Sequence, residues 1–370
     1  MKVIHVTYEA EGYGIGTFLF NLIRQQKNND KDLHIAIAFH KDGPCMDKFG
    51  KLGIPIHSLQ MKSARDFRLL LKFYKILKGY DIVNFHTNSP WAFLAAVLAR
   101  KKIIFIFHGA LGLRTFFKIP ITRLFMKHIF IRRCNIITFA SKSSLKHFIA
   151  GYGDIKSKDV NLEIFPYGLI IDNIKPCSER EFIREKLGLL NKFLIGTAVR
   201  MVQVKRPDLL IIALSQLKPR EEFSLILMGS GDDEYELYLR GLVKKACLDK
   251  NVHFLGYRSD AIDIINALDV FVMPSRREPF GLALLEAMAL GVPAIAFRDG
   301  GGTVDIIGDS GIVVSDVEEL SRAIELLKND TTLRKNKGEA GKIRARQFDI
   351  SKTAEILFSI YQKIYSRHTR

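Results

Sequence analysis

The chain has 370 residues, 48% of them hydrophobic and 26% charged, with a formal net charge of +17. This composition excludes a disordered or fibrous chain, and the length exceeds what one hydrophobic core usually serves, so we expect two domains of similar size. No apolar run reaches the roughly 18 residues that span a bilayer. The cysteines have no paired spacing, which disfavours a zinc site or a disulfide framework and is typical of a reducing cytosol.

The first half of the chain alternates short β-rich runs with amphipathic stretches of helical length. This alternation is typical of a parallel sheet covered by helices. We predict strands at residues 2–7, 33–39, 82–85, 103–107 and 135–138. Helices are predicted between them, for example at residues 16–26, 67–77 and 90–100.

The second half repeats the same alternation. Strands are predicted at residues 194–198, 224–228, 252–255, 270–272, 294–296 and 311–314, and helices at residues 206–217, 233–247, 261–267, 282–290 and 317–328. A last helix is predicted at residues 351–365, with no strand after it. The pattern predicts an α/β fold of two doubly wound, Rossmann-like domains: residues 1–170, joined by a C-terminal helix (352–370) that crosses back, and residues 171–351.

Ligands of doubly wound sheets bind outside the carboxyl ends of the strands, so we expect the active site in a cleft between the two domains. The first predicted strand leads into a glycine-containing loop with Gly14 and Gly16, then a helix. Such a loop allows close backbone approach to a phosphate, but a plain tight turn explains it equally well. It is not a dinucleotide fingerprint, since the second strand ends at Phe39-His40-Lys41 without the acidic ribose ligand.

Residues 274–289 carry more information. A predicted strand ends before them, Pro279 and Gly281 mark a turn, and a helix follows. The free amides at the start of that helix favour a diphosphate. Glu286 lies little more than a turn inside the helix, where its carboxylate could accept two hydrogen bonds from a ribose diol.

In this stretch the chain resembles the retaining glycosyltransferase family 4, of GT-B fold and bacterial surface-polysaccharide type. Glu278 and Glu286 match the family's glutamate pair, within the frame EPFGLALLEAMALGVPAIAF. The resemblance continues at the Arg-x4-Lys element of Arg200 and Lys205 and at residues 107–109, 227–231, 254–257 and 300–302. The chain departs from the family in its first loop, at His86-Thr87-Asn88, and at Asp305, where the family has a glutamate.

The resemblance and the chemistry together imply roles for these residues. Arg200 and Lys205 would stabilise the leaving diphosphate without a metal or another cofactor, Glu278 would hold hydroxyls of the donor sugar, and His108 would lie beside the reacting carbon. The remaining predicted donor-binding residues are Gly14, Gly16, Gly229, Tyr257, Phe280, Gly281, Leu282, Ala283 and Glu286.

The positive charge is concentrated in residues 1–175, which have a net charge of +15, against +2 for the rest. Within them, residues 113–133 mix bulky apolar residues with cations, a composition typical of a helix at an anionic membrane surface. A core helix with a basic solvent face is the alternative. The predicted membrane-facing cations are Arg114, Lys118, Arg123, Lys127, Arg132 and Arg133.

We therefore expect a metal-independent hexosyltransferase at the inner face of the cell membrane. It would move a hexose or N-acetylhexosamine from a nucleotide-diphosphate sugar, a UDP-sugar before GDP-mannose, to a lipid-linked oligosaccharide or lipopolysaccharide (O-antigen) acceptor, with retention. The enzyme alternative is a sugar-nucleotide epimerase or phosphorylase of the same fold. A basic nucleic-acid-binding protein is the alternative of another class, but the basic stretch lacks stacking aromatic residues on a β-platform.

Overall fold

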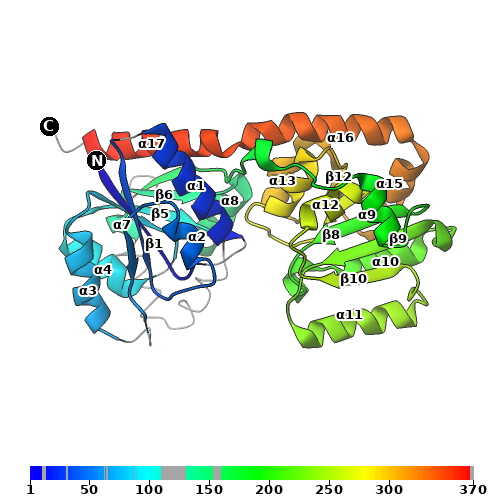
Figure 1. Cartoon of the computed structure of the whole chain (residues 1–370), viewed down its shortest axis with the longest axis horizontal. Coiled ribbons are helices and arrows are strands. Elements are labelled where there is room, and N and C mark those ends of the chain that lie inside the picture. The colour runs from blue at the N-terminus through cyan, green and yellow to red at the C-terminus, as the bar shows by residue number, and fades with distance from the viewer. Residues whose placement is uncertain are drawn as a thin grey trace. The chain divides into compact units, whose positions relative to one another are not determined.

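The computed structural model describes residues 1–10, 14–30, 32–61, 63, 66–87, 89–109, 131–152 and 160–366. The chain forms two compact units, the first from Met1–Gly168 with Ile350–Arg370 and the second from Leu169–Asp349 (Figure 1). Each unit contains one parallel sheet flanked by helices, which confirms the predicted α/β fold of two Rossmann-like domains.

The sheet of unit 1 has the strand order β3-β2-β1-β4-β5-β6-β7. Its strands are β1 (Lys2–Thr7), β2 (His34–Phe39), β3 (Ile56–Ser58), β4 (Ile82–Phe85), β5 (Lys102–Phe107), β6 (Ile136–Phe139) and β7 (Asn161–Ile164). The helices of this unit are α1 (Ile15–Asn29), α2 (Met46–Gly50), α3 (Arg68–Leu77), α4 (Pro90–Leu98), α7 (Ile131–Arg133), α8 (Lys142–Tyr152) and α17 (Ile350–Ser366). The central strands are buried along nearly their whole length because helices cover both faces.

The sheet of unit 2 has the strand order β10-β9-β8-β11-β12-β13. Its strands are β8 (Phe193–Ala198), β9 (Phe223–Met228), β10 (Val252–Gly256), β11 (Val270–Met273), β12 (Ala294–Phe297) and β13 (Ile312–Val314). Its α-helices are α9 (Arg180–Lys186), α10 (Asp208–Gln216), α11 (Asp233–Lys245), α12 (Ala261–Ala267), α13 (Leu282–Ala289), α14 (Gly302–Ile307), α15 (Val317–Asn329) and α16 (Thr331–Ala345). Short 3-10 turns, η2 to η6, lie at Ile171–Asn173, Gln203–Lys205, Arg220–Glu222, Gly308–Ser310 and Arg346–Phe348.

The C-terminal helix α17 packs against α1 within unit 1. Gly168 permits this return of the chain, since a Cβ there would lie 2.7 Å from the Thr353 hydroxyl oxygen and 2.9 Å from the Ile350 backbone. Thr353 then donates a hydrogen bond to the carbonyl oxygen of Pro166. The predicted crossing of this helix back to the first domain is thereby confirmed.

One predicted helix begins later in the structure than in the sequence prediction. Residue 206 was expected to open a helix, but α10 starts at Asp208. Arg206 has a left-handed backbone (φ 50°), which a right-handed helix cannot contain. Arg206 belongs instead to the loop that carries Lys205.

A buried ion cluster joins α9 to the sheet of unit 2. The Asp269 carboxylate accepts hydrogen bonds from Arg180, from Arg184 at 2.7 Å and from the amide of Leu194 at 2.8 Å. We expect Asp269→Ala to lower the free energy of unfolding by about 3 kcal/mol, because the nearly buried Arg184 guanidinium and the partly exposed Arg180 guanidinium lose their counter-charge. Urea unfolding measures this, with the exposed Asp249→Ala as control; a loss below about 1 kcal/mol for Asp269→Ala would contradict the assignment.

Candidate functional site

The start of α13 lies at the carboxyl edge of the second sheet, in the loop after β11. Gly281 caps the helix in a left-handed conformation (φ 105°), and no side chain accepts from the amides of the first turn. A Cβ at Gly281 would lie 2.9 Å from the methyl group of Thr303, so glycine also suits the packing there. Leu282 and Ala283 remain partly exposed, whereas Phe280 is buried against Phe348. An anion fits this helix start.

Glu278 lies just before that helix and forms an ion pair with Lys205. Its backbone is held by the neighbouring glycine loop: the Glu278 amide donates to the carbonyl of Gly300 at 2.8 Å, and the Gly302 amide donates to the Glu278 carbonyl at 2.7 Å. A Cβ at Gly301 would lie 2.8 Å from that carbonyl oxygen. The glycine run therefore allows two strand-end loops to approach closely, and their contact fixes Glu278.

The loop that carries Lys205 is fastened by Arg206. The Arg206 guanidinium binds both carboxylate oxygens of Asp299, at 2.9 and 2.6 Å, and donates to the carbonyl of Pro274 at 2.8 Å. The Arg276 amide also donates to the carbonyl of Val204 at 3.1 Å. Neither Arg206 nor Asp299 was predicted as a site residue from the sequence. Their pairing depends on the left-handed turn at Arg206, which no spacing in the sequence predicts.

Arg200 follows β8 and presents an exposed side chain. Among the residues that the structure describes, none forms an ion pair or a hydrogen bond with its guanidinium. The next residue, Met201, is buried, so the two side chains point to different sides of the loop. Gly229 lies against this loop, and a Cβ there would lie 2.0 Å from the carbonyl oxygen of Val199. Gly229 thus has a packing role beside its predicted donor-binding role.

Glu286 lies in the second turn of α13, and its carboxyl group has no hydrogen-bond partner within the described parts of the chain. The residue keeps some exposure, but protein surrounds its carboxyl group, and this burial raises its pKa from 4.5 to about 7. A carboxyl group with free acceptor oxygens and a pKa near neutrality is suited to a ligand that donates hydrogen bonds. Tyr257, after β10, is 71% exposed and offers an aromatic face to solvent.

Unit 1 holds the other predicted residues. Gly14 caps α1 with positive φ (55°) and no side-chain cap, and Gly16 is buried in the first turn. His108 directly follows β5, with hydrogen bonds at both ring nitrogens. Arg132 and Arg133 are exposed on α7, while Ile131 packs into the core. The predicted membrane-facing residues Arg114, Lys118, Arg123 and Lys127 lie outside the described residues.

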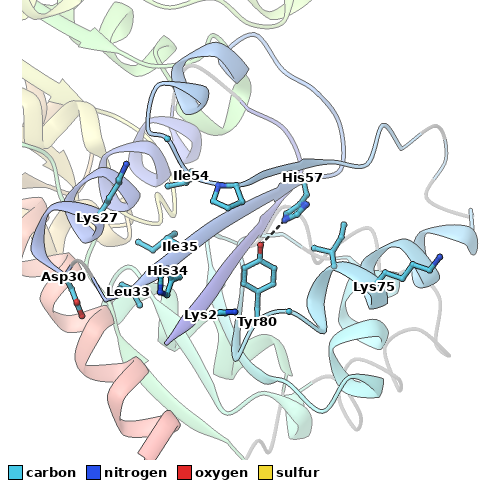
Figure 2. A pocket seen from close by; sticks show the side chains of 14 residues that line it. Lys2, Lys27, Asp30, Leu33, His34, Ile35, Ile54, His57, Lys75 and Tyr80 are labelled. Carbon is cyan, nitrogen blue, oxygen red and sulfur yellow. Dashed lines mark hydrogen bonds between the residues drawn. The ribbon is translucent and has the colours of Figure 1, made fainter.

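A hollow of about 810 Å³ lies elsewhere in unit 1, at the amino ends of its strands. Figure 2 shows it between Lys27, His34 and Lys75, with His57 hydrogen-bonded to Tyr80 at 2.9 Å. Lys27 and Lys75 occupy the last turns of α1 and α3, where a cation offsets the helix dipole. Because the reactive edge of a parallel sheet is its carboxyl edge, we assign no reaction to this hollow.

The described residues contain neither a metal-binding cluster nor a membrane-spanning helix. Within the described ranges, no group of three or more His, Cys, Asp and Glu side chains could hold a metal ion. The same residues contain no helix that is both long and apolar enough to cross a bilayer. Metal independence and attachment to a membrane surface both stay predictions.

Comparison with known proteins connects these loops to a reaction class. The family model "Glycosyltransferase Family 4" matches residues 13–162, and "Glycosyl transferases group 1" matches residues 179–344. Each match falls on one unit. The chain is a GT-B glycosyltransferase similar to family 4. The matches favour neither the epimerase or phosphorylase alternative nor a nucleic-acid-binding protein.

Similar proteins are named for different sugars. A GDP-mannose-dependent monoacylated phosphatidylinositol monomannoside mannosyltransferase of Corynebacterium glutamicum is 33% identical over 56% of this chain and 56% of its own length. The D-rhamnosyltransferase WbpZ of Pseudomonas aeruginosa is 27% identical over 85% of this chain and 82% of its own. The crystal structure of Anabaena HepE with UDP and glucose superposes with a TM-score of 0.83 at 22% identity, covering 98% of this chain and all of that one (100%). The last likeness concerns the fold.

Proposed function

We propose that this glycosyltransferase moves a hexose or N-acetylhexosamine from a nucleotide-diphosphate sugar to a lipid-linked oligosaccharide or lipopolysaccharide acceptor, with retention of configuration and without a metal. One observation carries the proposal: the Lys205–Glu278 ion pair lies directly before the uncapped start of α13, which also bears the unpartnered Glu286. A UDP-sugar is the first candidate donor and GDP-mannose the second. The HepE structure supports a UDP donor, and the mannosyltransferase supports GDP-mannose.

In this account each part of the site meets one part of the donor. The amides of Gly281, Leu282 and Ala283 bind phosphate oxygens, and Glu286 accepts hydrogen bonds from the ribose hydroxyls. Arg200 and Lys205 stabilise the negative charge that develops on the leaving diphosphate. Glu278, oriented by Lys205 and by the glycine loop, accepts hydrogen bonds from the donor sugar. Tyr257 offers a face on which the base can stack.

A thermal-shift panel of UDP-, GDP-, ADP- and dTDP-sugars tests the donor class, because a ligand that binds only the folded state stabilises it. A UDP-sugar or GDP-mannose at about 100 times its Kd should stabilise the protein by about 2.7 kcal/mol. Equal, negligible shifts with all four nucleotide classes would contradict a nucleotide-sugar donor. A shift with ADP- or dTDP-sugar alone would replace the proposed base.

Glu286→Ala is expected to weaken nucleotide binding by about 1–3 kcal/mol, the range for losing hydrogen bonds to a charged group. Binding to the ionised carboxylate should also release a proton near pH 7, because the free carboxyl group has a pKa of about 7. Affinity should therefore rise between pH 6 and pH 8. Calorimetry in two buffers of different ionisation enthalpy measures both effects. Unchanged affinity in a folded Glu286→Ala protein, with the exposed Glu318→Ala as control, would refute the ribose contact.

The acceptor side of the proposal places residues 113–133 on an anionic membrane. Each cation near the surface contributes about 1 kcal/mol of attraction, and salt weakens it. Reversing Arg123, Lys127, Arg132 and Arg133 to Glu should abolish sedimentation with anionic vesicles and spare nucleotide binding. The control reverses four exposed cations of unit 2: Lys244, Lys245, Lys250 and Lys335. Equal vesicle binding by the first variant and the parent would show that this segment is not the membrane-facing surface.

A further inference from the structure

A row of buried polar side chains crosses one face of the sheet in unit 1. His5 of β1 and Asn84 of β4 are paired across neighbouring strands, and both are fully buried. Their chain neighbours Ile4, Val6 and Val83 belong to the apolar cluster on the other face. Burying polar groups costs free energy unless they are hydrogen-bonded, so we expect the side chains of this row to have hydrogen-bond partners.

Three hydrogen bonds join the row into a chain. His5 Nδ1 lies 2.9 Å from His86 Nε2, and His86 Nδ1 lies 2.9 Å from His108 Nε2. His108 Nδ1 is hydrogen-bonded to the hydroxyl of Tyr167, which stacks on Phe18. Both ring nitrogens of His86 and of His108 are therefore occupied, so each ring is fixed from two sides.

At its His5 end, the row of hydrogen bonds lies near the C-terminal helix. The side-chain amides of Gln26 and Asn84 both donate to the hydroxyl of Tyr361 on α17. This orientation leaves the Gln26 carbonyl oxygen free, and the Gln26 side chain lies close enough to His5 to interact with its ring. His5 Nε2 and Gln26 Oε1 are both buried, and neither has a hydrogen-bond partner in the described structure. One is a ring nitrogen that can donate and the other is an acceptor, so pairing them satisfies both.

The hydrogen-bonded row of His5, His86, His108 and Tyr167 has only two possible proton arrangements while its rings are neutral. Burial lowers the pKa of His5 and of His108 to about 3 and holds the pKa of His86 well below 6.5, so each ring carries one N–H at neutral pH. Each hydrogen bond needs one donor and one acceptor. A change of tautomer at one ring therefore forces the same change at the others.

We propose that Gln26, His5 and His86 are positioning residues that hold His108 as a single neutral tautomer, with its proton on Nε2. The Gln26 carbonyl oxygen accepts from His5 Nε2–H, His5 Nδ1 accepts from His86 Nε2–H, and His86 Nδ1 accepts from His108 Nε2–H. Tyr167 then donates its hydroxyl proton to His108 Nδ1. The C-terminal helix sets the direction of the whole chain, because Tyr361 orients the Gln26 amide.

The consequence for the reaction rests on the proposed function, which places His108 beside the reacting carbon. With both nitrogens occupied and the ring neutral, His108 does not exchange a proton with the acceptor at neutral pH. It instead presents a ring of fixed orientation, and a misplaced group at a reacting centre slows the chemical step more than it weakens binding. Disrupting this row of hydrogen bonds should therefore lower kcat about tenfold and leave nucleotide affinity within about twofold of that of the parent protein.

Nitrogen NMR of the full-length protein with 15N-labelled histidine tests the tautomers directly, with His5, His86 and His108 assigned from single His→Gln variants. The parent should show all three rings as Nε2–H tautomers, unchanged between pH 8 and pH 5.5. Gln26→Leu removes the acceptor and should give His108 mixed tautomers, whereas Gln26→Glu, still an acceptor, should restore the Nε2–H form. Gln25→Leu, one residue away on α1, is the matched control and should change nothing.

An unchanged His108 tautomer in folded Gln26→Leu, or protonation of His108 near pH 6.5 in the parent, would overturn the proposal. If Gln26→Leu does not fold, Tyr361→Phe takes its place, since it removes one oxygen and frees the Gln26 amide to rotate; an unchanged His108 tautomer there is equally contradictory. The proposed function fails separately, by absence of sugar transfer in a parent protein whose NMR spectrum shows the ordered chain.

Discussion

Arg200→Ala is expected to lower kcat for sugar transfer by at least about 10²-fold, the effect of removing one preorganised electrostatic donor from a transition state. The side chain is exposed on the loop after β8, and no described residue neutralises its charge. The loop itself is fixed, since Arg206 ties its far end to Asp299 and Pro274. A free cation on a fixed loop can meet a developing phosphate charge without reorganisation.

Steady-state kinetics with saturating donor measure this effect. Arg200→Lys keeps the charge but loses the two-pronged geometry, so its activity should fall between those of the parent and the alanine variant. Arg322→Ala, an exposed cation on α15, is the control. Chelation by EDTA should have little effect on the parent. A kcat within twofold of the parent for Arg200→Ala, or strict dependence on added magnesium or manganese, would be incompatible with the proposed leaving-group chemistry.

Lowering the pH from 7 to 5 is expected to destabilise unit 1 strongly, although most carboxylates titrate only below this range. Unfolded histidine binds a proton near pH 6.5, whereas folded His5 and His108 stay neutral down to about pH 3 because they are buried. The unfolded state therefore binds more protons in this window, and the free energy of unfolding falls as the pH falls. Each of these rings should contribute a loss of about 2 kcal/mol between pH 7 and pH 5.

Urea unfolding at pH 7, 6 and 5 measures this loss, and the chain's single tryptophan, Trp91 on α4, reports on unit 1. Glu286 acts in the opposite sense in unit 2, because its raised pKa makes the folded state the better proton binder between pH 4.5 and about 7. Glu286→Gln removes that contribution. A Trp91 transition with the same urea midpoint at pH 7 and pH 5 would show that the rings of His5 and His108 are not held neutral.

The sequence pattern predicted the two sheets because long buried strands leave a strong signal. β5, β11 and β12 are nearly continuous apolar runs, and such runs are typical of parallel strands buried on both faces. The edge strands β3 and β7 were missed. Ile56–Ser58 has three residues, and Asn161–Ile164 contains Asn and Glu and is only partly buried, so neither gives a periodic apolar signal.

The site could be predicted in part for a similar reason. The sequence alone reveals glycines, a helix start and a glutamate inside an apolar helix. These features predicted Gly281 and Glu286 as site residues. The Arg206–Asp299 pair joins residues 93 positions apart, and the His5–His86–His108 chain joins three strands. Contacts of this kind depend on register and on a left-handed turn, which spacing along the chain does not encode.

The most direct test of glycosyl transfer uses UDP-sugars and GDP-mannose with a radiolabelled sugar, together with a lipid-linked oligosaccharide acceptor. We expect label to pass from one of these donors into the lipid fraction, the product to keep the anomeric configuration of the donor, and Arg200→Ala to reduce the transfer at least about 10²-fold. Release of free labelled sugar or an epimerised nucleotide sugar at the same rate with and without acceptor would contradict the account.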